Sequence, residues 1–298
     1  MIFKRIKAKL ARMGLINMSD EQFLKLIFSI AMDYELDLEN PLTFNEKLQW
    51  LKIHDRKSEY TKMVDKFDVK QFVTETIGSD YIIPTIGVYE KFEDINFEEL
   101  PNQFVVKCTH DSGGLIVCRN KSSFDKTAAK KKINKCLKRN FYNENREWPY
   151  KDVKPRIVVE KYMEDKNSGK ELKDYKFYCF HGEPRYLYVS EGLEDHSTAR
   201  IGFFDMEFKP APFGRTDFKR FEIPPLPPKN FEKMKEIARV LSRNNVFLRV
   251  DLYEINDRIY FGELTFTPCA GYMPFDPPEW DRKLGDLIDL TKVGKNEK

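Results

Sequence analysis

Two short segments carry side chains whose types and spacing suit phosphate and metal chemistry. The first is an apolar run, Phe104–Val106, which ends at Lys107 and continues into a polar loop. Gly113 and Gly114 in that loop allow backbone N–H groups to approach anionic oxygens closely. A lysine and two glycines at a strand end favour a phosphate-binding loop. A plain hairpin fits the same residues, and the G-x-x-x-x-G-K-[ST] pattern is absent.

The second segment places two acids on either side of one turn. Asp251 and Glu263 flank Asn256-Asp257 in runs typical of antiparallel strands, whose register can bring them side by side. Carboxylates among apolar residues repel each other unless a cation such as Mg²⁺ bridges them. Arg249 lies two residues before Asp251, on the same strand face, and suits a transferring phosphoryl group. A solvated pair of strand acids is the alternative.

Two further strands end or begin with polar residues. Val158–Met163 runs from an apolar strand into a polar loop, where backbone groups can pair with the edge of a base. Asp174 and Lys176 share one face of the next strand, as a surface ion pair or as a phosphate contact.

The surrounding pattern predicts an α+β protein that positions these residues. Helices are expected at both ends of the chain and after the hairpin, and antiparallel strands elsewhere. The expected helices are 1–13, 15–30, 44–53, 65–73, 126–141, 231–243 and 278–290, and the expected strands are 81–89, 104–107, 115–118, 156–162, 175–180, 185–189, 247–254 and 258–266. Thr43 and Glu46 form a capping box that opens the third helix. We expect a helical N-terminal region (1–62), a lid subdomain (63–163) and a core that holds the metal (164–298).

The order of these elements over residues 65–268 resembles the ATP-grasp superfamily, in which two α+β subdomains clasp ATP. The resemblance implies a role for each matching residue. Lys66 and Lys107 would contact the α and β phosphates, the loop over them would include His110, Ser112, Gly113 and Gly114, and Glu160, Lys161 and Met163 would line the adenine pocket. Asp251 and Glu263 would hold Mg²⁺, Arg249 would stabilise the acyl phosphate, and Lys176 would assist at the γ phosphate.

One position departs from the superfamily pattern. An Asn usually follows the metal glutamate by two residues, and here Thr265, a weaker metal ligand, stands there. Within the superfamily, the segments Pro41–Trp50, Asp174–Pro184 and Phe261–Phe266 are similar to the TupA-like branch, which is associated with surface-polysaccharide biosynthesis.

The resemblance implies an ATP- and Mg²⁺-dependent ligase that joins a carboxylate-bearing sugar or amino acid to an amine through an acyl phosphate. A glycosyltransferase of the same pathway and a kinase of a sugar precursor are the alternatives. The chain has no Asp-x-Asp motif, which argues against a glycosyltransferase. A kinase would use the same phosphate and metal residues. A polysaccharide-binding protein without activity is favoured only by the 14% aromatic content.

Composition limits the partners and the compartment. The net charge of +3 gives no reason to expect a nucleic-acid partner. The five cysteines lack zinc-ligand spacing, and their odd number argues against a complete disulfide framework, which indicates the cytosol. Residues 1–13 alternate apolar and basic residues at helical spacing, which fits either a helix on an anionic membrane surface or a terminal helix packed on its own domain. The predicted location is therefore cytoplasmic, with peripheral contact to the inner membrane face as an option.

Overall fold

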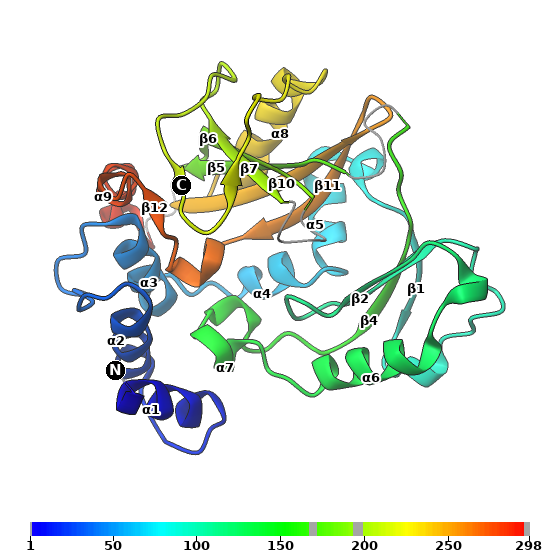
Figure 1. The fold of residues 1–298 in the computed structure, drawn as a ribbon, viewed down its shortest axis with the longest axis horizontal. Helices are drawn as coiled ribbons and strands as arrows, with labels where there is room; N and C mark the ends of the chain where they lie inside the picture. Colours follow the sequence, from blue (N-terminus) through cyan, green and yellow to red (C-terminus); the bar gives the residue numbers. More distant parts are fainter. Residues whose placement is uncertain (1, 167–171, 193–198, 295–298) are drawn as a thin grey trace. The chain divides into compact units, whose positions relative to one another are not determined.

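The chain forms two compact units in a computed structural model that describes residues 2–166, 172–192 and 199–294. We call residues 57–164 the central unit, and residues 1–56 with 165–298 the main unit. Each unit combines helices with a sheet, so the predicted α+β class is confirmed (Figure 1). Residues 1–56 cluster with the C-terminal segment and do not form a unit alone.

The main unit is built on a six-stranded sheet with the order β11-β10-β5-β6-β7-β9. Its helices are α1 (Ile2–Arg12), α2 (Asp20–Ala31), α3 (Phe44–His54), α8 (Phe231–Ser242) and α9 (Glu279–Gly285). Its strands are β5 (Asp174–Phe180), β6 (Glu183–Glu191), β7 (Arg200–Phe204), β9 (Lys219–Arg220), β10 (Phe247–Ile255) and β11 (Arg258–Thr265), with β8 (Gly214–Arg215) and β12 (Phe275–Asp276) pairing separately.

The central unit is built on a four-stranded sheet with the order β1-β4-β2-β3. Its strands are β1 (Thr85–Tyr89), β2 (Phe104–Cys108), β3 (Leu115–Cys118) and β4 (Ile157–Lys161). Its helices are α4 (Glu59–Val64), α5 (Val69–Ile77), α6 (Lys126–Leu137) and α7 (Tyr142–Asn145). The glycine-tipped hairpin β2–β3 is confirmed, and β1 lies at the sheet edge, as Pro84 predicts.

Several predicted elements are longer than the observed ones. The strand predicted from Tyr81 begins only at Thr85, because Ser79–Tyr81 forms a 3₁₀ turn and Pro84 follows it. The second helix begins at Asp20 rather than residue 15, because Ser19 caps it in a capping box with Gln22.

Helices α6 and α9 also end early. Helix α6 stops at Leu137 instead of residue 141. Helix α9 stops at Gly285 instead of residue 290. At Gly285 the chain passes so close to the start of α3 that a Cβ would lie 2.3 Å from the carbonyl oxygen of Leu42.

Side-chain alternation along the strands gives each sheet one apolar face and one face that carries functional groups. On β5, Phe177 and Cys179 face α8: Phe177 stacks on Phe231, and the Cys179 thiol lies 3.8 Å from the carbonyl oxygen of Ala238. Tyr178 lies on the opposite face with a cluster of aromatic side chains around Phe44. In the central unit, the α6 side of the sheet is the apolar core.

Candidate functional site

The central unit holds one buried glutamate between two lysines. Glu160, on β4, is 4% exposed. Its Oε2 lies 2.6 Å from the Nζ of Lys107 on β2, and its Oε1 pairs with Lys70 of α5. We call these three residues the lysine cluster. Sequence analysis missed Lys70, which lies on a helix 90 positions before Glu160.

Burial and charge act in opposite directions in the lysine cluster. Burial disfavours the Glu160 carboxylate, but the ammonium groups of Lys107 and Lys70 outweigh it, so the pKa of this carboxyl lies below its ordinary value. Burial lowers the pKa of Lys70, and Glu160 opposes that shift. Two lysines and one carboxylate leave an excess of positive charge, which suits an anionic ligand.

The predicted phosphate loop is held from beneath by buried side chains. His110 and Asp111 are 2% and 1% exposed, whereas Ser112 and Gly113 face solvent. The Nε2 of His110 lies 3.1 Å from the carbonyl oxygen of Cys136, so its imidazole points into the core. Of the predicted loop residues, Ser112 and Gly113 present accessible groups, and any role of His110 in ligand binding is left to its backbone.

Gly114 and Lys66 fix the two sides of this loop. Gly114 donates its N–H to Asp111 Oδ1 at 3.2 Å, and a Cβ there would lie 2.6 Å from that oxygen and 2.8 Å from the Cβ of Cys108. Only glycine allows this close approach. Lys66 donates its backbone N–H to Thr109 and its ammonium to the carbonyl oxygen of Asp111. The Lys66 ammonium therefore lies beside the loop, and its contact with a phosphate stays a prediction.

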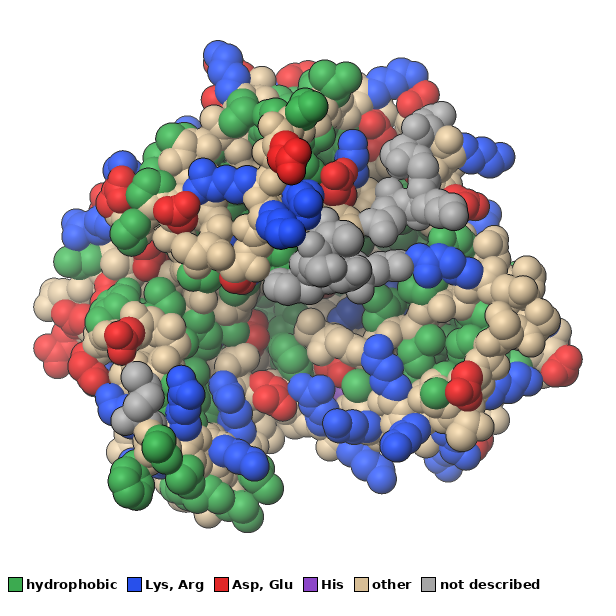
Figure 2. Space-filling view, in the orientation of Figure 1, with side chains coloured by type: hydrophobic (Ala, Val, Ile, Leu, Met, Phe, Trp, Pro, Cys, Tyr) green, Lys and Arg blue, Asp and Glu red, His purple; other side chains and the backbone are tan. Residues whose placement is uncertain are grey.

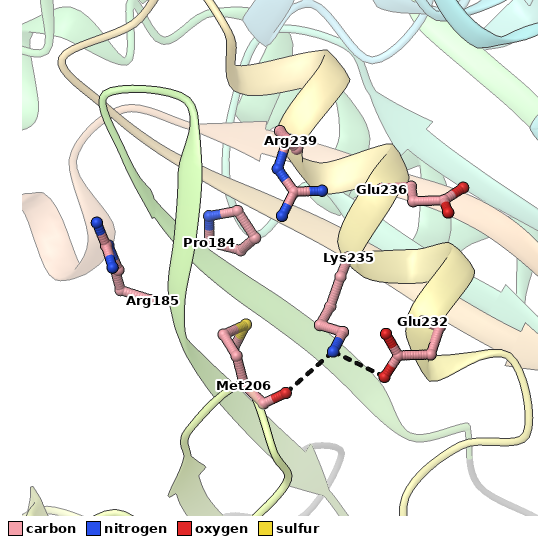
Figure 3. A pocket seen from close by; sticks show the side chains of 7 residues that line it. All are labelled: Pro184, Arg185, Met206, Glu232, Lys235, Glu236 and Arg239. Carbon is pink, nitrogen blue, oxygen red and sulfur yellow. Dashed lines mark hydrogen bonds and ion pairs between the residues drawn. The ribbon is translucent and has the colours of Figure 1, made fainter.

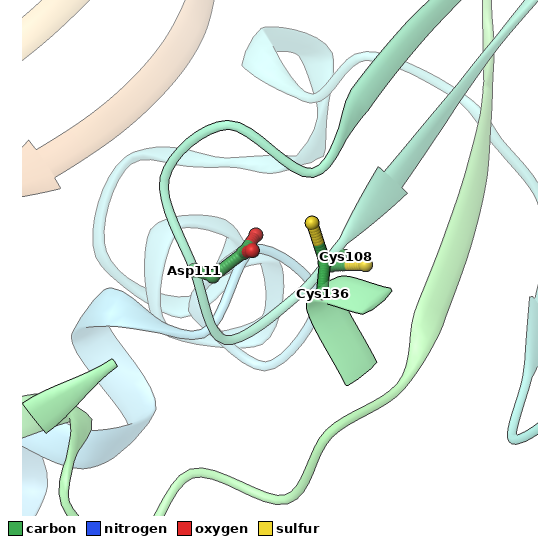
Figure 4. A group of neighbouring side chains, drawn as sticks. All are labelled: Cys108, Asp111 and Cys136. Carbon is green, nitrogen blue, oxygen red and sulfur yellow. The ribbon is translucent and has the colours of Figure 1, made fainter. Parts of the chain in front are cut away.

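A buried group of donor atoms lies under the loop. The Asp111 carboxylate faces the thiols of Cys108 and Cys136, with the three donor atoms within 4.8 Å of one another (Figure 4). Burial raises the pKa of both thiols, and Asp111 raises them further. A structural zinc site needs four ligands. Among the described residues this group supplies three, so we assign it to anchoring the loop.

The main unit brings Asp251 and Glu263 together on β10 and β11. The two residues are paired directly in the antiparallel register, which confirms the predicted juxtaposition. Asp251 is 1% exposed, and the Glu263 side chain is 44% exposed. Arg249 bridges them: its Nε lies 2.7 Å from Asp251 Oδ1, and its Nη2 lies 2.8 Å from Glu263 Oε1.

Lys176 of β5 completes this group, which we call the acidic cluster: Asp251, Glu263, Arg249, Lys176 and Asp174. The Lys176 ammonium lies 2.8 Å from Asp251 Oδ2 and 3.2 Å from Asp174 Oδ1. Burial disfavours the charged forms of Asp251, Arg249 and Lys176, but the opposite charges beside them outweigh it. The pKa of Asp251 is therefore lowered, and those of Arg249 and Lys176 are raised.

The donor chemistry of the acidic cluster fits Mg²⁺. Asp251 and Glu263 offer carboxylate oxygens, the ligands that hard cations prefer. Three acids and two basic groups leave an excess of negative charge. The hydroxyl of Thr265 lies 3.3 Å from Glu263 Oε1 and donates to it, so this threonine orients a predicted ligand.

Polar side chains of α3 hold the turn that follows β11. Cys269, Ala270 and Gly271 have φ values of 50°, 53° and 72°, an unusual run of left-handed residues. Gln49 donates to the carbonyl oxygen of Gly271 at 2.7 Å, and Lys52 donates to that of Ala270 at 2.8 Å. A Cβ on Gly271 would lie 2.3 Å from Gln49 Nε2.

A third residue of α3, Asn45, binds the chain just after this turn, at Met273. It accepts from the backbone N–H of Met273 at 2.8 Å and donates to its carbonyl oxygen at 3.0 Å. Asn45, Gln49 and Lys52 are at most 3% exposed. We call these three residues the α3 clamp. Sequence analysis identified the segment but missed this role, although three polar residues at helical spacing among apolar ones were a usable signal.

Arg215 is a second residue that sequence analysis missed. Its guanidinium stacks over Phe218 at 5.0 Å, lies over Tyr188 at 6.0 Å, and pairs with Asp217. Only about 10% of its side chain is exposed. A fixed, partly covered guanidinium of this kind suits a carboxylate or phosphate group.

The predicted adenine-pocket residues lie at the end of β4. Lys161 is exposed and donates its backbone N–H to the carbonyl oxygen of Pro84 at 3.0 Å. Met163 is half-buried beyond the strand. Their contact with a base stays a prediction.

A pocket of about 410 Å³ lies elsewhere in the main unit, between β6 and α8 (Figure 3). None of its lining residues is a predicted site residue. Its Lys235 donates to the carbonyl oxygen of Met206 at 3.0 Å and pairs with Glu232, and Arg239 pairs with Glu183. The charges of this pocket are largely neutralised within the protein.

The comparison with protein families agrees with this architecture. A model described as TupA-like ATPgrasp matches residues 46–289. The chain therefore belongs to the TupA-like ATP-grasp family. No match was found among curated proteins.

Solved structures with a similar fold include ligases. D-alanine–D-alanine ligase from Bacillus anthracis complexed with ATP is 17% identical, with 91% of this chain and 93% of that chain covered and a TM-score of 0.47. A second structure of that ligase is 20% identical, with 76% of this chain and 66% of that chain covered and a TM-score of 0.41. A RimK domain ATP-grasp protein from Sphaerobacter thermophilus DSM 20745 is 10% identical, with 79% and 70% covered and a TM-score of 0.43. These likenesses concern the fold alone.

Proposed function

We propose that the chain is an ATP- and Mg²⁺-dependent carboxylate–amine ligase. The observation that carries the proposal is the pairing of Asp251 with Glu263 beside Arg249 and Lys176, in a chain of the ATP-grasp family. The lysine cluster supports phosphate binding, since Lys107 and Lys70 exceed the charge of Glu160.

The reaction has two steps. A carboxylate oxygen of the substrate attacks the γ phosphorus of ATP, the bond to the β-phosphate oxygen breaks, and ADP leaves. An amine then attacks the acyl carbon, loses a proton, and inorganic phosphate leaves. No protein nucleophile is required, so catalysis depends on positioning and on neutralising charge.

Each named residue has a role in this proposal. Asp251 and Glu263 would hold Mg²⁺, which neutralises charge on the phosphates, with Thr265 orienting Glu263. Arg249 would stabilise negative charge on the acyl phosphate, and Lys176 would neutralise the γ phosphate. Lys66 and Lys107 would contact the α and β phosphates, and the loop at Ser112–Gly114 would cover them. Glu160, Lys161 and Met163 would line the adenine pocket.

The pathway and the location are part of the proposal. Membership of the TupA-like family supports a role in surface-polysaccharide biosynthesis, with a uronic acid or amino acid as the carboxylate. Dependence on ATP supports a cytoplasmic location. Among the described residues, no helix is long and apolar enough to cross a bilayer.

Product analysis tests the reaction. We expect ADP and phosphate to be released only when ATP, Mg²⁺, a uronic or amino acid and an amine are all present. A stable phosphorylated product would mean a kinase instead. Release of UDP from a sugar nucleotide without ATP would mean a glycosyltransferase. Either outcome would overturn the ligase proposal.

A further inference from the structure

Helix α1 of the main unit exposes its large apolar side chains to solvent. Ile2, Phe3 and Ile6 are 74%, 88% and 52% exposed, and Met13, directly after the helix, is 61% exposed. The space-filling view shows hydrophobic side chains gathered beside basic ones at the lower left, where α1 lies in Figure 1 (Figure 2). Large apolar groups gathered in this way indicate an interaction surface.

The face of α1 that packs on the protein is a different one. Ala8 and Ala11 are at most 4% exposed and belong to a core cluster with residues of α2. Lys4 lies on the same side, where its ammonium donates to Ser29 Oγ and pairs with Glu35, both at 3.1 Å. At 3.6 residues per turn, this side lies roughly opposite the side that carries Ile2, Phe3 and Ile6.

Packing on the rest of the described chain therefore does not explain why α1 carries large apolar side chains on one side. The helix is attached through two alanines, which bring its backbone close to α2. Ile2, Phe3 and Ile6 remain exposed among the described residues of this chain, and Leu10 on the same side is partly buried. Helix α1 is therefore a terminal helix packed on its own domain, but it packs through Ala8 and Ala11 and not through its large apolar side chains.

The charged residues of α1 indicate which kind of surface its exposed side binds. All charged residues of α1 are basic. Arg5 and Lys9 lie along one border of the apolar stripe and Lys7 along the other, and none of these three forms an ion pair within the described part of the chain. A helix with apolar residues between basic borders can insert its apolar side chains among acyl chains while its cations contact anionic headgroups.

We propose that α1 docks the protein on an anionic lipid surface, with Ile2, Phe3 and Ile6 inserted below the headgroups and Arg5, Lys7 and Lys9 among them. Lys4, Ala8 and Ala11 keep the helix attached to the main unit. The docking requires neither ATP nor turnover, so it can fail or hold independently of the ligase proposal.

Vesicle sedimentation of the full chain tests this docking. We expect binding to vesicles of phosphatidylcholine with about 30% phosphatidylglycerol, weaker binding to phosphatidylcholine alone, and a loss of affinity with added salt. Phe3→Ser with Ile6→Ser should lower the partition coefficient about tenfold or more, because the inserted apolar area is lost. Arg5→Gln with Lys9→Gln should lower it by about tenfold on the anionic vesicles only.

Two matched controls come from elsewhere in the chain. Ile223→Ser with Leu226→Ser removes side chains that are 85% and 84% exposed but lie outside α1. Lys131→Gln with Lys135→Gln removes the same charge from α6, whose apolar residues Ala129 and Ile133 are buried. Both controls should bind vesicles as the wild type does.

Several outcomes would overturn the docking. These are unchanged binding of both α1 variants, equal binding to neutral and anionic vesicles, or loss of binding in the controls. A dimer in sedimentation velocity that Phe3→Ser with Ile6→Ser converts to a monomer would assign the face to a second copy of the chain instead. Circular dichroism melts should agree for all variants, because every substituted side chain is exposed.

Discussion

The two units each bury one carboxylate between two basic side chains, but the charge balance of the two clusters is opposite. In the lysine cluster, Glu160 is the single acid facing Lys70 and Lys107. In the acidic cluster, Asp251 has Arg249 and Lys176 beside it, and two further acids join the same network. The net charge of the cluster therefore favours an anion in the central unit and a cation in the main unit.

The largest expected effect comes from the same kind of change made in both clusters. Asp251→Asn removes a proposed Mg²⁺ ligand and should lower ADP release about 100-fold or more. Glu160→Gln removes the counter-ion of two lysines but no proposed Mg²⁺ ligand, and should lower ADP release by about tenfold. Mg²⁺ titrations of turnover measure both. Equal losses in the two variants would show that the clusters do not differ as their charges suggest.

A smaller effect is expected when one cation is removed from the lysine cluster. Lys107→Ala should weaken ATP binding about tenfold, because one phosphate contact and its charge are lost. Calorimetry with ATP measures the affinity, and Lys154→Ala, at an exposed ion pair with Glu90, serves as the control. An ATP affinity equal to that of the wild type would remove Lys107 from the phosphate site.

The smallest effect concerns pH. The pKa of Glu160 is lowered below its ordinary value of 4.5, so its ion pairs stabilise the fold above that pH and are lost as pH falls through the lowered pKa. Between pH 7 and pH 3.5, the wild type should lose more unfolding free energy than Glu160→Gln, which has no carboxyl to titrate. Urea unfolding measures the difference, with Glu98→Gln at an exposed site as the control. Parallel curves for wild type and Glu160→Gln would contradict the assignment.

Local sequence patterns predicted the parts of the site that lie close together in the chain. Asp251 and Glu263 are separated by a short turn, so strand alternation was enough to bring them together. The hairpin that carries Lys107 and Gly114 was predicted for the same reason. In both cases the paired residues are close together in the sequence, so few other strand pairings are possible.

Contacts between distant segments could not be predicted in this way. Lys70 meets Glu160 from a helix far earlier in the chain, and Gln49 meets Gly271 across more than 200 residues. The side-chain direction of His110 was also missed, because a loop has no periodicity that separates its inner from its outer residues. Such features depend on tertiary packing.

The α3 clamp has a consequence for the order in which the protein matures during synthesis. Residues 57–164 form a compact unit from one continuous stretch of chain, so this unit can fold as soon as it has left the ribosome. Asn45, Gln49 and Lys52 are made earlier, but their partners at residues 270–273 are made more than 200 residues later. Helix α3 therefore leaves the ribosome before the central unit, and it acquires these polar partners after the central unit has been made.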